Sequence, residues 1–243
     1  MFATRCATQA KYLRAGILGA AVSGALLAAP AAQAVDGVVA SAAAANMYLW
    51  RGIDLGHGSA AVSGDLSYHL GGGYAGVWMS SGDSTLGQEY DYYAGYGAAL
   101  DDFSFDISLW NYNYSDNTTK NEGFGISHDT TGDLSEIIGT LGWKTIKFSY
   151  YDNIAGATGY KYFTLSGSYD KFSALVGRHE FNPGAGGNKD MTHLNLTYSY
   201  NDNLAFTASK VINQDCSKGD NDCSGSIDED LKFVVTYTLP IKI

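Results

Sequence analysis

The charged side chains that could act on a solute are few, and they recur on the polar faces of alternating segments. Arg51 and Arg178 are the only arginines after residue 34. Charges that line a pore set its electric field, so such positions predict a path for ions or small solutes. The alternative is structural ion pairing of the arginines with Asp54, Asp91 or Glu180. The predicted pore-lining set is Arg51, Asp65, Glu89, Asp91, Asp106, Lys147, Arg178 and Glu180.

One acidic segment near the C-terminus has the spacing of a calcium-binding loop. From Asp220 to Asp228 it follows the EF-hand pattern of acids, hydroxyls and a central glycine. The last ligand of that pattern, a bidentate Glu, is replaced by Leu231. The sequence therefore predicts at most a weak Ca²⁺ site and no other cofactor, and the alternative is an acidic, solvated loop. The predicted ligands are Asp220, Asp222, Ser224, Ser226 and Asp228.

The constellations that could make this protein an enzyme are weak. His57-Gly58-Ser59 has the His-x-Ser spacing of some barrel lipid hydrolases, but no acid or amide is placed to orient the histidine. Ser127-His128-Asp129 consists of sequence neighbours, which cannot form a triad by adjacency alone. The sequence contains no Gly-x-Ser-x-Gly elbow. We therefore predict a protein without enzymatic activity.

The first 34 residues have the layout of a secretory signal peptide. A basic stretch without acids comes first, and residues 15–29 are apolar and rich in Ala and Gly. Ala32-Gln33-Ala34 then supplies a small-x-small cleavage site. We expect cleavage after Ala34, which leaves residues 35–243 as the mature chain.

Two cysteines remain in that mature chain. Cys216 and Cys223 form an even pair in a compartment that is oxidising for exported proteins. We predict that they form a disulfide that closes the last outer loop.

Strands are the elements that position the predicted pore-lining residues, because apolar and polar residues alternate with period two along most of the mature chain. Residues 103–109 alternate Phe, Phe, Ile and Leu with Ser, Asp and Ser, and residues 231–239 alternate in the same way. The predicted strands are 43–53, 61–70, 74–82, 89–98, 103–114, 134–143, 145–152, 160–169, 172–181, 191–200, 204–212 and 231–242.

The connections between the predicted strands alternate between short turns and longer loops. Membrane barrels have short periplasmic turns and longer outer loops, and a tilted strand needs about 9–11 residues to cross a bilayer. We therefore predict an all-β fold, an up-and-down antiparallel transmembrane β-barrel of about twelve strands. A soluble barrel with its faces reversed would show the same period, but the long aromatic face favours contact with lipid. The longer loops are predicted at 54–60, 83–88, 115–133, 153–159, 182–190 and 213–230.

Three segments resemble a known family. Asn46-Met47-Tyr48-Leu49-Trp50-Arg51-Gly52-Ile53-Asp54, at the predicted first strand, is similar to the opening signature of the TorF-type porins, the Gcw_chp family of proteobacteria. Residues 73–81 and 89–96 resemble its next two blocks. The resemblance implies a location in the outer membrane and leaves the substrate open. One departure is the final residue, Ile243, where outer-membrane barrels usually carry an aromatic residue that the insertion machinery reads.

The balance of acidic and basic residues argues against one further class of function. The 243 residues include 25 acidic and 15 basic residues, which disfavours nucleic-acid binding because affinity for phosphates comes mainly from Lys and Arg. We predict an outer-membrane porin that lets small cationic or neutral solutes diffuse, with membrane lipid, lipopolysaccharide and the barrel-insertion machinery as further partners. The alternative is a closed structural or adhesive barrel whose acidic loops bind divalent cations or lipopolysaccharide.

Overall fold

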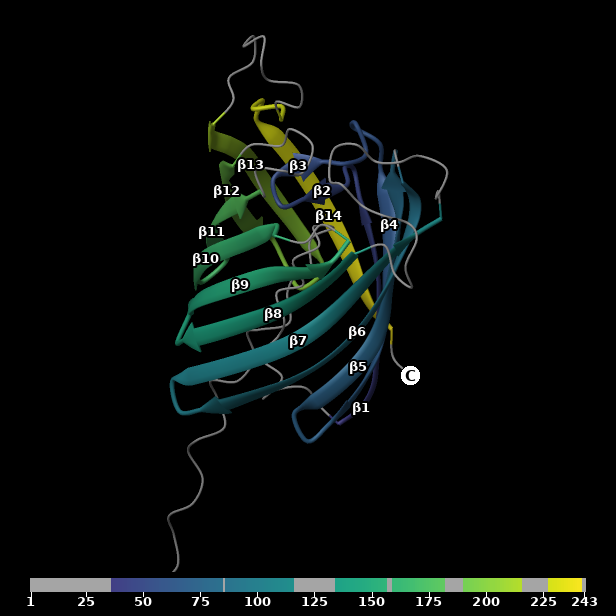
Figure 1. Ribbon diagram of the computed structural model, residues 1–243, viewed down its shortest axis with the longest axis vertical. Coiled ribbons are helices and arrows are strands. Elements are labelled where there is room, and N and C mark those ends of the chain that lie inside the picture. Colours follow the sequence, from purple (N-terminus) through teal and green to yellow (C-terminus); the bar gives the residue numbers. More distant parts are fainter. Residues whose placement is uncertain are drawn as a thin grey trace, which may run out of the picture.

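The computed structural model describes residues 36–84, 86–115, 134–156, 159–181, 190–215 and 227–241. Within them, twelve strands form a closed barrel in which strands that follow one another in the chain are antiparallel neighbours (Figure 1). The first and last strands also pair with each other and close the ring. The predicted fold class is confirmed. The barrel strands are β1 (Gly37–Ala45), β4 (Ala61–Leu70), β5 (Gly73–Asp83), β6 (Gly87–Leu100), β7 (Phe103–Tyr114), β8 (Leu134–Trp143), β9 (Ile146–Ala155), β10 (Lys161–Tyr169), β11 (Phe172–Glu180), β12 (Met191–Ser199), β13 (Leu204–Gln214) and β14 (Lys232–Ile241).

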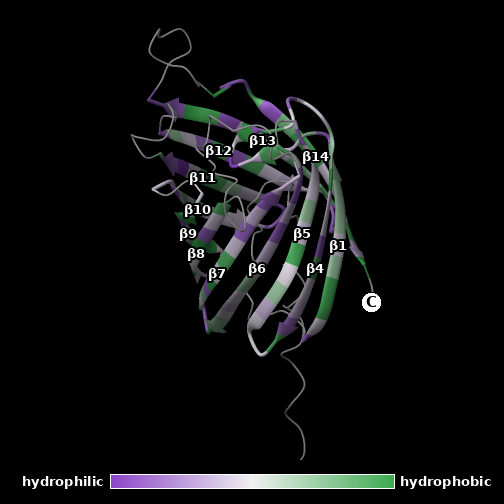
Figure 2. Cartoon of the chain, turned by 45° about the vertical axis from the view of Figure 1, so that its right-hand side comes forward, coloured by the Kyte–Doolittle hydropathy of each residue, from purple (hydrophilic) through white to green (hydrophobic). Residues whose placement is uncertain are grey.

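The two faces of each strand differ in polarity, as the alternation predicts. On β7, the four apolar side chains of residues 103–109 point outward and are 47% to 64% exposed, whereas Asp106 and Ser108 point inward and are buried. Figure 2 shows the same mixture of hydrophobic and hydrophilic positions along the strands around the barrel. The molecule therefore has an apolar outer surface and a largely polar inner wall.

Four of the five short turns at one end of the barrel begin with a residue in the left-handed conformation. Gly71, Asp101, Lys144 and Asp170 have φ between 50° and 56°, as required in the tight turns that match the twist of paired strands. We call this end the turn end, and the opposite end, where the longer connections lie, the loop end. Among the described residues, no helix is long and apolar enough to cross a membrane.

The predicted first strand is wrong in position. The barrel strand is β1, at residues 37–45, and the predicted strand 43–53 covers a segment that leaves the wall and forms the short hairpin of β2 (Leu49–Trp50) and β3 (Ile53–Asp54). Residues 37–45 consist mostly of Ala and Val and show little alternation. The apolar and aromatic residues that follow predicted a strand of the barrel wall, but they lie inside the barrel instead.

Candidate functional site

The connection between β1 and β4 turns into the barrel. Residues 46–60, called the inner loop below, contain the β2–β3 hairpin, which lies within the ring of strands in Figure 1. Tyr48, Leu49, Trp50 and Arg51 each expose 7% or less of their surface. A segment that buries four large side chains against the inner wall must occupy part of the lumen. The inner loop is therefore the element through which the lumen can be narrowed.

The tip of the hairpin consists of Arg51 and Gly52. Their φ angles are 48° and 84°, as in the type I′ turns that favour Gly, Asn or Asp. For an arginine this left-handed conformation costs on the order of 1–2 kcal/mol. A Cβ built at Gly52 would lie 2.5 Å from Cγ of His193 on β12, so glycine is needed for the tip to approach this wall. Contacts with the wall must therefore offset the cost of the left-handed backbone at the tip.

The guanidinium of Arg51 lies in a cage of one carboxylate and several aromatic rings. Its Nη1 donates to Oε1 of Glu136 at 2.9 Å, and its Nη2 donates to Oε2 at 2.5 Å. Both side chains are fully buried. Its Cζ lies 4.6 to 4.7 Å from the ring centroids of Trp50, Tyr151 and Tyr162. A bidentate carboxylate and stacked rings suit a planar guanidinium that has left water.

The electrostatics of the cage keep Arg51 charged. Burial alone lowers the pKa of Arg51, but the negative charge of Glu136 and its hydrogen bonds raise that pKa well above its ordinary value. The pair is also tied to β7, because the hydroxyl of Tyr112 donates to Oε2 of Glu136 at 2.9 Å. Arg51 and Glu136 are thus a buried ion pair that joins the inner loop to the wall.

A ring of hydrogen bonds runs from Arg51 through the wall and back to Arg51. Its Nη1 donates to the hydroxyl of Tyr160 at 3.1 Å, and that hydroxyl lies 2.9 Å from Nδ1 of His179 on β11. Nε2 of His179 lies 2.9 Å from the carbonyl oxygen of Arg51. A carbonyl only accepts, so Nε2 carries the proton, Nδ1 accepts, and the Tyr160 hydroxyl donates to it.

The start of the inner loop is fixed to other strands of the wall. The hydroxyl of Tyr48 donates to Oε2 of Glu89 on β6, and Tyr114 donates to Oε1 of the same carboxylate at 3.0 Å. Burial, together with the charge of Glu89, raises the pKa of Tyr48 well above its ordinary value. Asn46 exchanges two hydrogen bonds with the backbone of β14, at Phe233 and Val235. The inner loop is thus tied to strands on both sides of the lumen.

Nearer the turn end, the inner wall carries further charges. Oδ2 of Asp65 accepts a 2.6 Å hydrogen bond from Tyr93, and Oδ1 of Asp106 accepts one of 2.8 Å from Tyr74. Lys147 lies on the inward-facing side of β9, where it is paired with Gly142. This part of the wall is polar and only partly covered, so it can contact water or a solute.

Comparison with known proteins places the chain in a family. Residues 29–216 match a family described as "Bacterial protein of unknown function (Gcw_chp)". The chain belongs to the Gcw_chp family. The resemblance noted in the sequence is therefore confirmed, and the first block that carried it, residues 46–54, lies in the inner loop. A search of curated proteins finds no match.

The Gcw_chp barrel is also similar to solved structures of other barrels. OccAB4 from Acinetobacter baumannii is 14% identical, with a TM-score of 0.39 over 75% of this chain and 54% of that one. OprD from Pseudomonas aeruginosa is 12% identical, with a TM-score of 0.38 over 86% of this chain and 68% of that one. This chain thus spans about half the length of OccAB4. At these identities the likeness concerns the fold alone.

The structure corrects two of the predicted pore-lining residues. Arg178 and Glu180 flank the inward-facing His179 on β11, so they point outward, on the same face as the exposed Phe172 and Val176. Arg178 forms ion pairs at 3.6 Å with Glu180 and at 3.1 Å with Asp190 near the loop end. Both positions therefore belong to the outer face of this Gcw_chp barrel.

The remaining predicted residues lie inward, but the partner of Arg51 differs from all three predicted partners. Asp65, Glu89, Asp91, Asp106 and Lys147 occupy inward-facing positions of their strands. Arg51 pairs with Glu136, which sequence reasoning missed. A signal was present, because Glu136 is the only charged residue of the predicted strand 134–143. His179, the other missed residue, carries no distinguishing pattern in the sequence.

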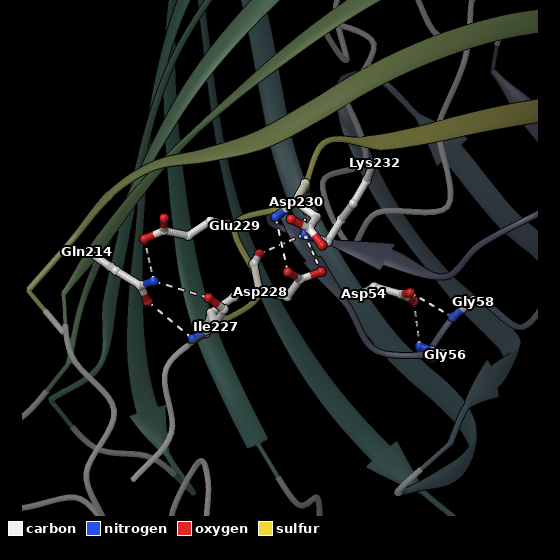
Figure 3. A network of polar contacts seen from close by, with 9 residues as sticks. All are labelled: Asp54, Gly56, Gly58, Gln214, Ile227, Asp228, Glu229, Asp230 and Lys232. Carbon is white, nitrogen blue, oxygen red and sulfur yellow. Dashed lines mark hydrogen bonds and ion pairs between the residues drawn. The ribbon is translucent and has the colours of Figure 1, made fainter. Parts of the chain in front are cut away.

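The predicted calcium loop and disulfide fall mainly outside the described residues. Cys216, Cys223 and four of the five predicted ligands lie there, and the fifth, Asp228, is used otherwise. Lys232 donates to the carbonyl oxygens of Asp228 and Asp230 at 2.8 and 3.2 Å and forms an ion pair with the Asp228 carboxylate at 3.6 Å (Figure 3). Across the described ranges, no group of three or more His, Cys, Asp or Glu side chains could hold a metal ion.

Figure 3 also shows how the ends of two loops are fixed. Gln214 binds the backbone of Ile227 in both directions at 3.1 Å and donates to Glu229. In the inner loop, Asp54 accepts from the backbone N–H groups of Gly56 and Gly58 at 3.0 and 2.7 Å. These bonds hold the turn at Gly56 that leads the inner loop back to β4.

Proposed function

We propose that this protein is a passive channel of the outer membrane for small solutes, and that the inner loop sets the width of its lumen. The outer face supports a membrane location, because rows of apolar side chains would otherwise be exposed to water. Strands of nine to fourteen residues are long enough to cross a bilayer. Export through a signal peptide at residues 1–34 and insertion by the barrel-insertion machinery belong to this proposal.

The observation that carries the channel function is a polar inner wall with a separate loop folded against it. A barrel built only for stability could fill its interior with strand side chains. Here a loop enters from the loop end and binds the wall through a few polar contacts at Arg51, Tyr48 and Asn46. Such a segment can move without breaking the ring of strands.

We expect the channel to prefer cations. Inward-facing carboxylates outnumber the inward-facing cations at the described positions, and a lumen of one sign concentrates ions of the opposite sign. Reversal potentials of the refolded protein in a planar bilayer under a salt gradient test both parts of this proposal. A cation-selective current supports it, whereas an anion-selective current contradicts the preference. The carboxylates are Asp65, Asp83, Glu89, Asp91, Asp106 and Glu136, and the cations are Arg51, Lys147 and Lys232.

The second candidate function is a closed structural or adhesive barrel. It is favoured by the complete burial of the Arg51–Glu136 pair, which closes part of the lumen tightly. On this interpretation the acidic loops bind divalent cations or lipopolysaccharide. The two functions differ in one result, because a closed barrel inserted in a bilayer carries no ionic current.

We also propose that Cys216 and Cys223 form a disulfide in the exported protein. The expected result is a mature chain without free thiols, because an exported pair of cysteines meets an oxidising compartment. Mass spectrometry after alkylation without reduction tests it, and two alkylated thiols would show that no bond forms. Calorimetric titration with Ca²⁺ of the same protein and of its Asp220→Ala, Asp222→Ala variant tests the weak calcium site in the same loop.

A further inference from the structure

We infer that His179 is a positioning residue that holds the inner loop only while its imidazole is neutral, so that acid releases the loop and opens the lumen. This inference rests on the proposed channel function. It comes from the ring of hydrogen bonds that joins Arg51, Tyr160 and His179.

Each hydrogen bond in that ring needs one particular arrangement of protons. Tyr160 accepts from the guanidinium of Arg51 and donates to Nδ1 of His179. His179 in turn donates from Nε2 to the backbone carbonyl of Arg51. This arrangement requires the neutral Nε2–H tautomer, because a doubly protonated imidazole has no acceptor. Protonation at Nδ1 would leave the hydroxyl proton of Tyr160 without its acceptor in a buried place.

Protonation would also add a second positive charge to the cage. The titratable and charged groups that face His179 are Arg51 of the inner loop, Tyr160 before β10, Tyr162 on β10 and His193 on β12. Of these only Arg51 is charged, with the same sign as protonated His179. The nearest counterion in the cage, Glu136, is already bound by both terminal nitrogens of Arg51. A like charge in a buried site is unfavourable, so the protonated state favours separation of the inner loop from β11.

The hairpin tip makes this separation easier. Arg51 has the left-handed backbone conformation, which costs energy for any residue that has a Cβ. Contacts with the wall keep the tip in this conformation. When His179 no longer accepts from Tyr160 and faces a like charge, the tip can relax by moving away from β11. The bonds of Asn46 and Tyr48 with the wall and those of the inner loop with Ser84 do not depend on His179 and remain in place.

The pH dependence of conductance in planar bilayers tests the inference. Because burial and the charge of Arg51 oppose protonation of His179, we expect the open probability of the wild-type protein to rise only well below the ordinary titration range of a histidine, at about pH 4 and lower. Loss of one buried hydrogen-bond partner corresponds to a rise of about fivefold to a hundredfold. The His179→Gln variant should lose this pH response, since an amide does not titrate.

The matched control is His69→Gln. His69 is an inward-facing histidine of β4 near the turn end, and its Nε2 lies 3.0 Å from the Ser67 hydroxyl. This variant should keep the pH response of the wild type. A response that survives in His179→Gln, or that disappears in His69→Gln, overturns the inference. A wild-type conductance that does not change with pH overturns it as well.

A second measurement separates failure of this inference from failure of the channel function. Quenching of Trp50 fluorescence by acrylamide reports release of the inner loop and does not depend on a current. The Trp50→Phe variant gives the signal of the other tryptophans, which is subtracted. We expect quenching to increase in acid for the wild type and not for His179→Gln. Acid-dependent quenching without current at any pH would contradict the channel function and support the release of the inner loop by protonation of His179. A current with pH-independent quenching would support the channel function and contradict the release of the inner loop by protonation of His179.

Discussion

Replacing Glu136 by Gln is expected to destabilise the folded barrel by about 3–5 kcal/mol, the usual effect of removing one partner from a buried ion pair. The isosteric amide keeps the shape of the side chain but leaves the charge of Arg51 buried without its counterion. Denaturant unfolding in lipid vesicles measures this effect.

The matched control for that prediction is Glu180→Gln. Glu180 pairs with Arg178 on the outer face at 3.6 Å, and both side chains are more than two-fifths exposed. Exposed pairs contribute about 0–1 kcal/mol, so this variant should be nearly neutral. The double variant Arg51→Met, Glu136→Met should be more stable than Glu136→Gln, because it removes both charges together. Equal effects of Glu136→Gln and Glu180→Gln would show that the cage does not hold the inner loop.

The second large effect is expected on the outer face. Ile107 lies near the middle of β7, points outward and is 55% exposed. An arginine there would lie near the bilayer midplane and should destabilise the protein in lipid by about 2–4 kcal/mol. The measurement is again unfolding from vesicles, with Ile107→Arg compared with the wild type.

Position along the same strand supplies the control. Phe103 also points outward but begins β7 at the turn end. An arginine near the interface costs only about 0–1 kcal/mol, so Phe103→Arg should be much milder than Ile107→Arg. If both variants were equally stable, the outer face would not be in contact with lipid.

The sequence predicts the barrel well because its physical signal is local and repeated. Along residues 103–109 the apolar and polar side chains alternate without interruption, and β7 follows this pattern with its apolar face outward. Short turns such as that at Asp101 carry residues that accept a left-handed backbone. Strand period and turn chemistry are both properties of adjacent residues, so the sequence shows them directly.

The position of the inner loop could not be predicted in the same way. Residues 46–54 are as apolar and aromatic as a strand, and nothing local distinguishes burial inside a barrel from exposure to lipid. The predicted contacts of Arg51 failed for a related reason, because Glu136 is distant in sequence and is brought close only by closure of the barrel. The inward positions of Asp65 and Asp106 were accessible to sequence reasoning, since strand period alone fixes them.

Arg178 shows the limit of charge as a guide to the lumen. An arginine on a barrel strand was expected to point inward, because charge at the bilayer midplane is unfavourable. Arg178 avoids that cost while pointing outward, because it lies near the loop end and pairs with Glu180 and Asp190. Depth along the strand therefore matters as much as the face.

The central claim is that the inner loop narrows a conducting lumen and is held there by the Arg51–Glu136 pair. The most direct test is the single-channel conductance of the wild type and of Glu136→Gln, measured at neutral pH in the same bilayer. We expect a small conductance for the wild type and a severalfold larger one for the variant. Equal conductance in the two proteins, with Glu136→Gln correctly folded, would contradict it.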